Sequence, residues 1–476
     1  MTFKQTTNGY RAAAATYLFI VYAFGVFSKS AWSDDFPSLL DPDSVAQHAA
    51  RDGRVVYGLL IHLLFSHFNT VGSLFVLRLI GLIGLILLND SLIKKLSKID
   101  FPTKYIIAST FAFTLPSFQF TSHWAVTFIF GWAALFAVAG YNLITQNSLS
   151  KKVLGFLFFV TSILLYPLLT FFLFSFIYFL WSARGQSYKP LFIQTLTGMS
   201  IMVVASIMSY AVSYFYLRVN ELSFNARVSI VNIDQIPDKL LFFISRPFVM
   251  AYRPFLIDSP SFISAVFVTV FSLSILAFLV WTKNRSILKT LYDLLIFNFF
   301  LALSIAPLLV VSQNQIDMRF VASNTWLFTS IISLLIFEFI ENLENRFPLM
   351  RRYLLFLVPI SLLSIGAVTI NVNFLSFFHG PYNQKEYFFN QQISKCSSSQ
   401  LQSGFYIVPR GIPWPKRSYI GAYSQTTDLE SSWVPIGALT NYLKDNNLPI
   451  GVKPVYGTVE GDSTKCEIKL DEYPGR

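Results

Sequence analysis

Residues 70–89 have the sequence TVGSLFVLRLIGLIGLILLN, in which Arg78 is the one charged residue. Twenty helical residues extend about 30 Å, which matches the hydrocarbon core of a bilayer. Similar apolar runs recur along the chain, whose 476 residues are 54% hydrophobic and only 13% charged. The stretch predicts a membrane-spanning helix, and its repetition predicts an all-α polytopic membrane bundle.

The apolar runs predict about eleven spanning helices. The least regular region is 153–183, which has Lys151-Lys152 before it and Arg184 after it. We expect two short helices that turn at Tyr166-Pro167, because proline disfavours helix at the residue before it. A re-entrant pair is the alternative. The expected helices lie near 12–29, 70–89, 103–121, 123–145, 153–166, 167–183, 190–216, 261–281, 290–311, 320–341 and 352–373.

An odd number of spans places the two termini on opposite sides of the membrane. The short loops on the N-terminal side hold most of the basic clusters, so this side is predicted to be cytoplasmic and the C-terminus to lie outside. The net charge of +11 is explained by this bias. We therefore expect no nucleic-acid binding.

The polar residues divide the chain into two parts. Residues 1–373 form the predicted membrane module, with large outer loops at 30–69 and 217–260. Residues 374–476 form a small mixed C-terminal domain, with strands expected near Gly404–Val408 and Lys453–Val459. The two cysteines, Cys396 and Cys466, both lie in this part. Outside the cytoplasm they are compatible with a disulfide, and two free thiols are the alternative.

The first outer loop is predicted to contain two amphipathic helices. Asp43 is a candidate N-cap for a short helix that ends near Arg51, and Asp52-Gly53 interrupts it. A second, half-apolar helix at 54–67 is expected to lie along the membrane surface. Together they would cover a cavity at the outer end of the bundle.

Two adjacent carboxylates, Asp34 and Asp35, directly follow the first predicted helix. Alone, such a pair is also typical of a solvated helix boundary. The nearby charges of Asp52 and Arg54 favour an active-site cleft, in which a carboxylate acts as a base and arginine binds a phosphate. Arg54 is also compatible with a simple salt bridge at a helix start.

Two further arginines are candidates for binding a phosphate. Arg319 lies at the outer mouth of two predicted helices, where it would neutralise a lipid phosphate, with Asp317 as a supporting partner. A plain Asp317–Arg319 ion pair is the alternative. Arg78 lies within a spanning helix, where a charged residue is a functional candidate, although its side chain can also extend to the interface.

Cofactor motifs are not evident in the sequence. The five histidines show no metal-ligand spacing, and no glycine-rich nucleotide-binding motif occurs. We therefore assign no metal site and no certain cofactor, and a divalent cation at the acidic pair stays open.

The order of these features resembles the serotype-converting O-antigen glucosyltransferases, which are multispanning membrane enzymes of the GT-C type. The resemblance rests on Ser33-Asp34-Asp35 after the first helix, the Asp52-Gly53-Arg54 step, the outer Arg319 and the C-terminal tail. It implies a protein of the bacterial inner membrane with a cytoplasmic N-terminus and a periplasmic C-terminus.

The resemblance also implies the chemistry. Glucose would pass from undecaprenyl-phosphate glucose to a sugar of the lipid-linked O-antigen repeat, in a single inverting displacement on the periplasmic face. Asp34 would be the base and Asp35 would support it. A donor synthase and a small flippase would be its partners. An O-antigen polymerase and a non-enzymatic polysaccharide or lipid flippase are the competing hypotheses.

Overall fold

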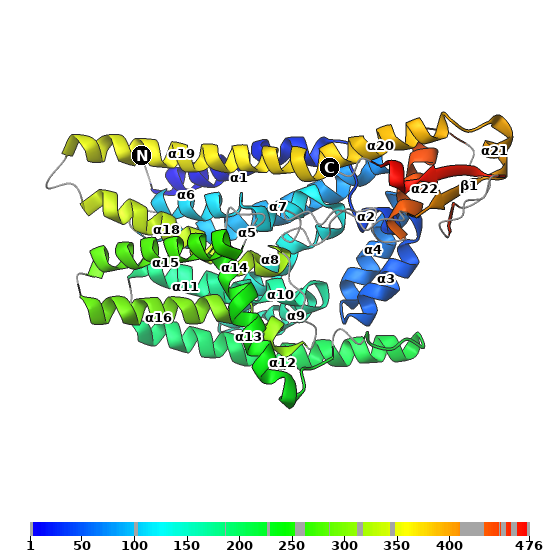
Figure 1. Cartoon of the computed structure of the whole chain (residues 1–476). Coiled ribbons are helices and arrows are strands. Elements are labelled where there is room, and N and C mark those ends of the chain that lie inside the picture. Colours follow the sequence, from blue (N-terminus) through cyan, green and yellow to red (C-terminus); the bar gives the residue numbers. More distant parts are fainter. Residues whose placement is uncertain are drawn as a thin grey trace.

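The computed structural model is a bundle of long helices with a small mixed domain at one end (Figure 1). It describes residues 3–99, 103–185, 187–225, 229–252, 262–284, 286–311, 318–342, 348–409, 433–446, 448, 454–457 and 464–473. Within these residues, seven helical segments are long and apolar enough to cross a membrane. They contain α1 (Phe3–Phe27), α5 (Leu74–Leu96), α8 (Phe130–Ile144), α11 (Phe172–Arg184), α12 (Tyr188–Val219), α18 (Ala322–Asn342) and α19 (Pro348–Phe374).

The other predicted spans correspond to four further helices and to one segment that is divided in two. The segment 103–121 is divided into α6 (Thr103–Ala112) and α7 (Pro116–His123), because Leu115 is extended and Pro116 begins a new helix. Helices α9 (Leu149–Leu165), α15 (Phe262–Asn284), α16 (Ile287–Leu303) and α17 (Pro307–Val310) cover the rest. The helical membrane class is confirmed, and the count of eleven spans stays a prediction.

A helical hairpin forms at Tyr166-Pro167, as the sequence predicts. Helix α9 ends at Leu165, and Tyr166 adopts an extended backbone (φ −158°, ψ 98°). Pro167 then begins α10 (Pro167–Thr170), which leads into α11. Both arms of this hairpin pack against α8. The turn therefore brings Tyr166 to the end of the bundle that carries Asp34, here called the site end.

The first loop folds into α2 (Asp35–Leu40), α3 (Pro42–Arg51) and α4 (Val55–His67). Figure 1 shows that α3 and α4 lie side by side and run across the site end, not along the bundle. The two predicted helices are confirmed, but the predicted cap is wrong. The carboxylate of Asp41, not Asp43, accepts the Ser44 N–H (3.0 Å), because Pro42 already occupies the first helical position.

The C-terminal domain begins on a helix that continues from the bundle. A π-helical turn at Leu375–His379 joins α19 to α20 (Gly380–Ile393), so the expected boundary at 373/374 falls inside one helical run. After α21 (Ser398–Ser403), three parallel strands follow in the order β2-β1-β3. They are β1 (Phe405–Val408), β2 (Val455–Tyr456) and β3 (Cys466–Lys469), and α22 (Trp433–Asp445) packs beside them. Strands β1 and β2 match the prediction, whereas β3 is additional.

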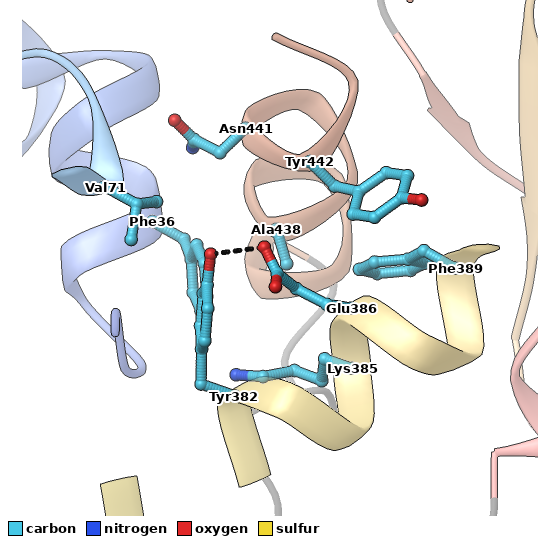
Figure 2. A pocket seen from close by; sticks show the side chains of 9 residues that line it. All are labelled: Phe36, Val71, Tyr382, Lys385, Glu386, Phe389, Ala438, Asn441 and Tyr442. Carbon is cyan, nitrogen blue, oxygen red and sulfur yellow. Dashed lines mark hydrogen bonds between the residues drawn. The ribbon is translucent and has the colours of Figure 1, made fainter. Parts of the chain in front are cut away.

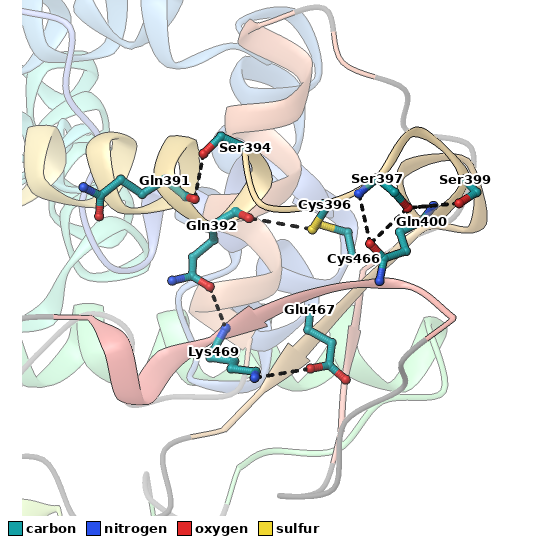
Figure 3. Close-up of a disulfide and its surroundings, with 10 residues drawn as sticks. All are labelled: Gln391, Gln392, Ser394, Cys396, Ser397, Ser399, Gln400, Cys466, Glu467 and Lys469. Carbon is teal, nitrogen blue, oxygen red and sulfur yellow. Dashed lines mark hydrogen bonds and ion pairs between the residues drawn. A yellow bond between two sulfur atoms is a disulfide. The ribbon is translucent and has the colours of Figure 1, made fainter.

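Cys396 and Cys466 form a disulfide, so the question that the sequence leaves open is answered (Figure 3). The bond joins the end of α20 to β3 across 70 residues of chain. Closing a loop of that length stabilises a fold by about 4 kcal/mol in the chain-entropy model. The backbone N–H of Lys469 also donates to the Gln392 side chain (3.5 Å), which fixes β3 against the same helix.

Candidate functional site

Asp35 is a buried anchor of the first loop. Its two carboxylate oxygens accept hydrogen bonds from the backbone N–H groups of Trp32 (3.1 Å) and Val126 (3.0 Å). The side chain has no exposed surface. Burial raises the pKa of Asp35 to about 7, although the Arg78 charge and the two N–H donors act in the opposite direction. Both oxygens are engaged, so this carboxylate positions the loop.

Asp34 differs from its neighbour because it is partly exposed. The preceding Ser33 has φ 45°, an uncommon value for a residue with a side chain, and it donates a long hydrogen bond to Asp34 (3.4 Å). Burial raises the pKa of Asp34, while the charges of Arg319 and Arg54 oppose that rise. These three charged side chains come from separate parts of the sequence, and we call them the Asp34 cluster.

Arg54 is held in place by its neighbours in the first loop. Its Nη2 donates to the carboxylate of Asp52 (2.6 Å), whose other oxygen accepts from Asn225 (2.7 Å) in the loop after α12. The guanidinium lies 5.3 Å from the ring centre of Tyr57 and 5.9 Å from that of Tyr166. Since arginine is attracted to aromatic faces, the two tyrosines fix its position beside Asp34.

The local backbone explains why Asp52-Gly53-Arg54 can make this turn. Helix α3 ends at Arg51, and Gly53 adopts φ +76°, a left-handed conformation that favours glycine. The Gly53 N–H donates to Ala50 O (2.9 Å), and its carbonyl accepts from the Ser213 hydroxyl (3.2 Å). The turn therefore directs Arg54 back to the site end.

Arg319 comes from a distant part of the chain. It precedes α18, and its guanidinium lies 4.4 Å from the ring centre of Trp124. The ring of Trp32 meets the same Trp124 edge-on, with 4.8 Å between centroids. Trp124 therefore connects Arg319 to the residues that precede Asp34. Asp317, the expected partner of Arg319, lies outside the described residues.

One peptide unit, at Val126, connects the start of α2 with α4. The N–H of Val126 donates to Asp35, and its carbonyl accepts from the Tyr57 hydroxyl (2.9 Å). Tyr57 belongs to α4, and Val126 belongs to the short turn before α8. This pair of bonds holds the turn, α2 and α4 together beneath the Asp34 cluster.

Arg78 has different surroundings from the other two arginines. It is fully buried, and it donates to the carbonyls of Gly25, Ser28 (2.7 Å) and Ser30 at the end of α1. Carbonyls at the C-terminal end of a helix receive no hydrogen bond from within that helix. A cationic donor such as Arg78 therefore satisfies them well. The guanidinium therefore supports the chain segment that leads to Asp34, and the phosphate-binding role expected from the sequence stays a prediction.

The C-terminal domain forms part of the wall around α2. Figure 2 shows α20 and α22 beside Phe36, the residue after Asp35. The Lys385 ammonium lies 4.5 Å from the Phe36 ring centre, and Tyr382 donates to Glu386 (2.7 Å). A Cβ atom added to Gly437 would lie 2.9 Å from the Phe36 Cβ. The domain thus packs directly on α2, the helix that begins at Asp35.

Sequence reasoning identified the charges of the Asp34 cluster but missed its aromatic partners. Tyr57, Trp124 and Tyr166 come from three separate segments, and nothing in their local sequence connects them. The predicted turn at Tyr166 was the one available signal. Among the described residues, no group of three or more His, Cys, Asp or Glu side chains is arranged to hold a metal.

Neither the scan against protein-family models nor the search of curated proteins finds a match to this chain.

Proposed function

We propose that this protein is a periplasmic-face glycosyltransferase of the bacterial inner membrane. It transfers glucose from undecaprenyl-phosphate glucose to a sugar of the lipid-linked O-antigen repeat and thereby modifies serotype. The observation that carries the proposal is the Asp34 cluster, in which one partly exposed carboxylate lies in the field of Arg54 and Arg319 at one end of an apolar bundle.

The reaction requires a base and a site for the leaving phosphate. In the proposed step, Asp34 removes the proton from the acceptor hydroxyl while that oxygen attacks the anomeric carbon of glucose. The bond from this carbon to the phosphate oxygen breaks, and the polyprenyl phosphate leaves with its electron pair. Attack from the opposite face inverts the anomeric centre. The raised pKa of Asp34 supports its use as a base near neutral pH.

The two arginines suit the other half of the reaction. Negative charge develops on the phosphate as the bond breaks, and guanidinium groups bind phosphate with two parallel hydrogen bonds. Arg54 and Arg319 are each held against aromatic rings, so they need little reorganisation in the transition state. Asp35 and Arg78 act in this proposal as positioning residues.

The proposal is tested with membranes that contain the protein, lipid-linked O-antigen and labelled polyprenyl-phosphate glucose. We expect label to enter the O-antigen without a change in its chain length. Longer chains without added glucose would favour the polymerase. Movement of the lipid-linked sugar across the bilayer without covalent transfer would favour the flippase. Polyprenyl-phosphate mannose is the matched donor that tests the preference for glucose.

A further inference from the structure

A cavity of about 220 Å³ lies at the end of the bundle away from Asp34. It is enclosed by the last turns of α11 and α15, the first turns of α12 and α16, and α18. Figure 1 shows the end of α15 and the start of α16 far from α2, close to the end where α1 begins. This cavity therefore cannot be part of the Asp34 cluster.

The inner wall of the cavity is apolar and its mouth is basic. Leu276, Phe297 and Ile331 are buried side chains that line it. Lys283 and Lys289 line it as well, and both are exposed at the end of the bundle. Lys283 pairs with Glu338 (3.0 Å), and Lys289 is an exposed residue beside it in the lining. Lysines at the membrane surface attract anionic head groups.

The polar side of the cavity has an acceptor that lacks a donor. The carboxylate of Asp293 accepts from the Tyr188 hydroxyl and from Asn284 Nδ2 (2.7 Å). Because an ionised carboxylate only accepts, the Asn284 amide must point its NH₂ group toward Asp293. Its Oδ1 is then buried without a hydrogen-bond partner among the described residues. A buried acceptor of this kind favours a ligand that brings a hydroxyl group.

We propose that this cavity binds an anionic lipid whose phosphodiester head group carries hydroxyl groups. The phosphate contacts the lysines at the mouth, a head-group hydroxyl donates to Asn284 Oδ1, and an acyl or prenyl chain follows the apolar wall. The lipid stabilises the packing of α11, α15 and α16 at this end. The inference is independent of the proposed glycosyl transfer, because it uses none of the residues of the Asp34 cluster.

The test uses full-length protein in nanodiscs of phosphatidylcholine that contain phosphatidylglycerol, with native mass spectrometry to count the lipids retained after release. Lys289→Gln is expected to weaken phosphatidylglycerol retention about fivefold, since one surface lysine contributes roughly that much to anionic-lipid binding. Lys152→Gln, which removes an exposed lysine from α9, is the matched control and is expected to behave like the wild type. Equal retention by Lys289→Gln and the wild type would refute the site.

A second comparison examines the head-group hydroxyl. The wild type is expected to prefer phosphatidylglycerol over phosphatidylmethanol, which has no hydroxyl donor, and Asn284→Leu is expected to lose that preference. A wild type that retains both lipids equally would contradict the role of Asn284. Displacement of phosphatidylglycerol by inorganic phosphate alone would show that the cavity takes a free phosphate, and the lipid proposal would then be wrong.

Discussion

The carboxylate of Asp35 accepts the backbone N–H of Val126 at 3.0 Å, across 91 residues of sequence. This bond connects the loop after α1 with the turn before α8, while the Tyr57 hydroxyl binds the other side of the same peptide unit. The partly exposed Asp34 is the adjacent residue. The acidic pair therefore divides into a buried anchor and a partly exposed carboxylate whose pKa is influenced by the charges of Arg319 and Arg54.

The substitution Asp35→Asn should reduce stability. Asparagine offers one acceptor where the aspartate offers two, so its NH₂ group would face the N–H of either Trp32 or Val126. Leaving a buried donor unsatisfied costs about 1–3 kcal/mol, which should appear as a lower free energy of unfolding in detergent. Asp34→Asn is the matched control and should change that free energy by less than about 0.5 kcal/mol. Equal stability of the two variants would show that Asp35 is not an anchor.

The pH dependence of stability should also report on Asp35. Its pKa is about 7 in the folded protein, against about 4 in an unfolded chain. Between these values the folded state holds more protons, so this contribution to stability is complete below about pH 4 and is lost as the pH rises through 7. We expect the melting temperature of the wild type to fall more steeply than that of Asp35→Asn over this range. Parallel curves would contradict the raised pKa.

The outline of the fold was accessible from the sequence because it depends on local patterns. The proline at Pro167 and the break at Gly53 act within a few residues, and both predictions are confirmed. The apolar run at 70–89 predicts a spanning helix, which continues to Leu96. The sequence predicts the N-cap at Asp43, which follows Pro42 as directly as Asp41 precedes it. Only the geometry shows that Asp41 provides the cap.

The organisation of the site was less accessible because it depends on contacts between distant segments. The sequence indicates that Asp34, Arg54 and Arg319 are unusual charges, but not that Arg319 lies on Trp124 or that Arg54 lies between Tyr57 and Tyr166. The contacts of Arg78 could not be predicted from the sequence for the same reason. A charge in a spanning helix suggests function, yet its partners are carbonyls at the end of α1.

The substitution Asp52→Ala should affect the binding of the donor lipid. It removes the acceptor that holds Arg54 (2.6 Å) and leaves Asn225 without its partner. If Arg54 binds the donor phosphate, KM for polyprenyl-phosphate glucose should rise about tenfold, the equivalent of about 1.4 kcal/mol, with a smaller change in kcat. The control is Asp43→Ala, which removes an exposed carboxylate that pairs with His62 in the same loop. A similar KM in both variants would separate Arg54 from donor binding.

The substitution Gly437→Leu should detach the C-terminal domain from α2. A side chain there would meet the Phe36 Cβ at 2.9 Å and its carbonyl oxygen at 3.1 Å, and backbone cannot yield as a flexible side chain does. We expect faster proteolysis of the tail and lower transfer activity. Gly9→Leu is the control, because a Cβ at Gly9 meets no atom within 4 Å. Full activity of Gly437→Leu would show that the domain is not needed to position α2.

The proposed role of Asp34 as the base is tested most directly by glucose transfer from polyprenyl-phosphate glucose with purified Asp34→Asn. The variant should keep the melting temperature of the wild type and lose about 10²- to 10⁴-fold in kcat, the usual contribution of a general base. A kcat within about twofold of the wild-type value, in protein that is equally folded, would contradict Asp34 as the base.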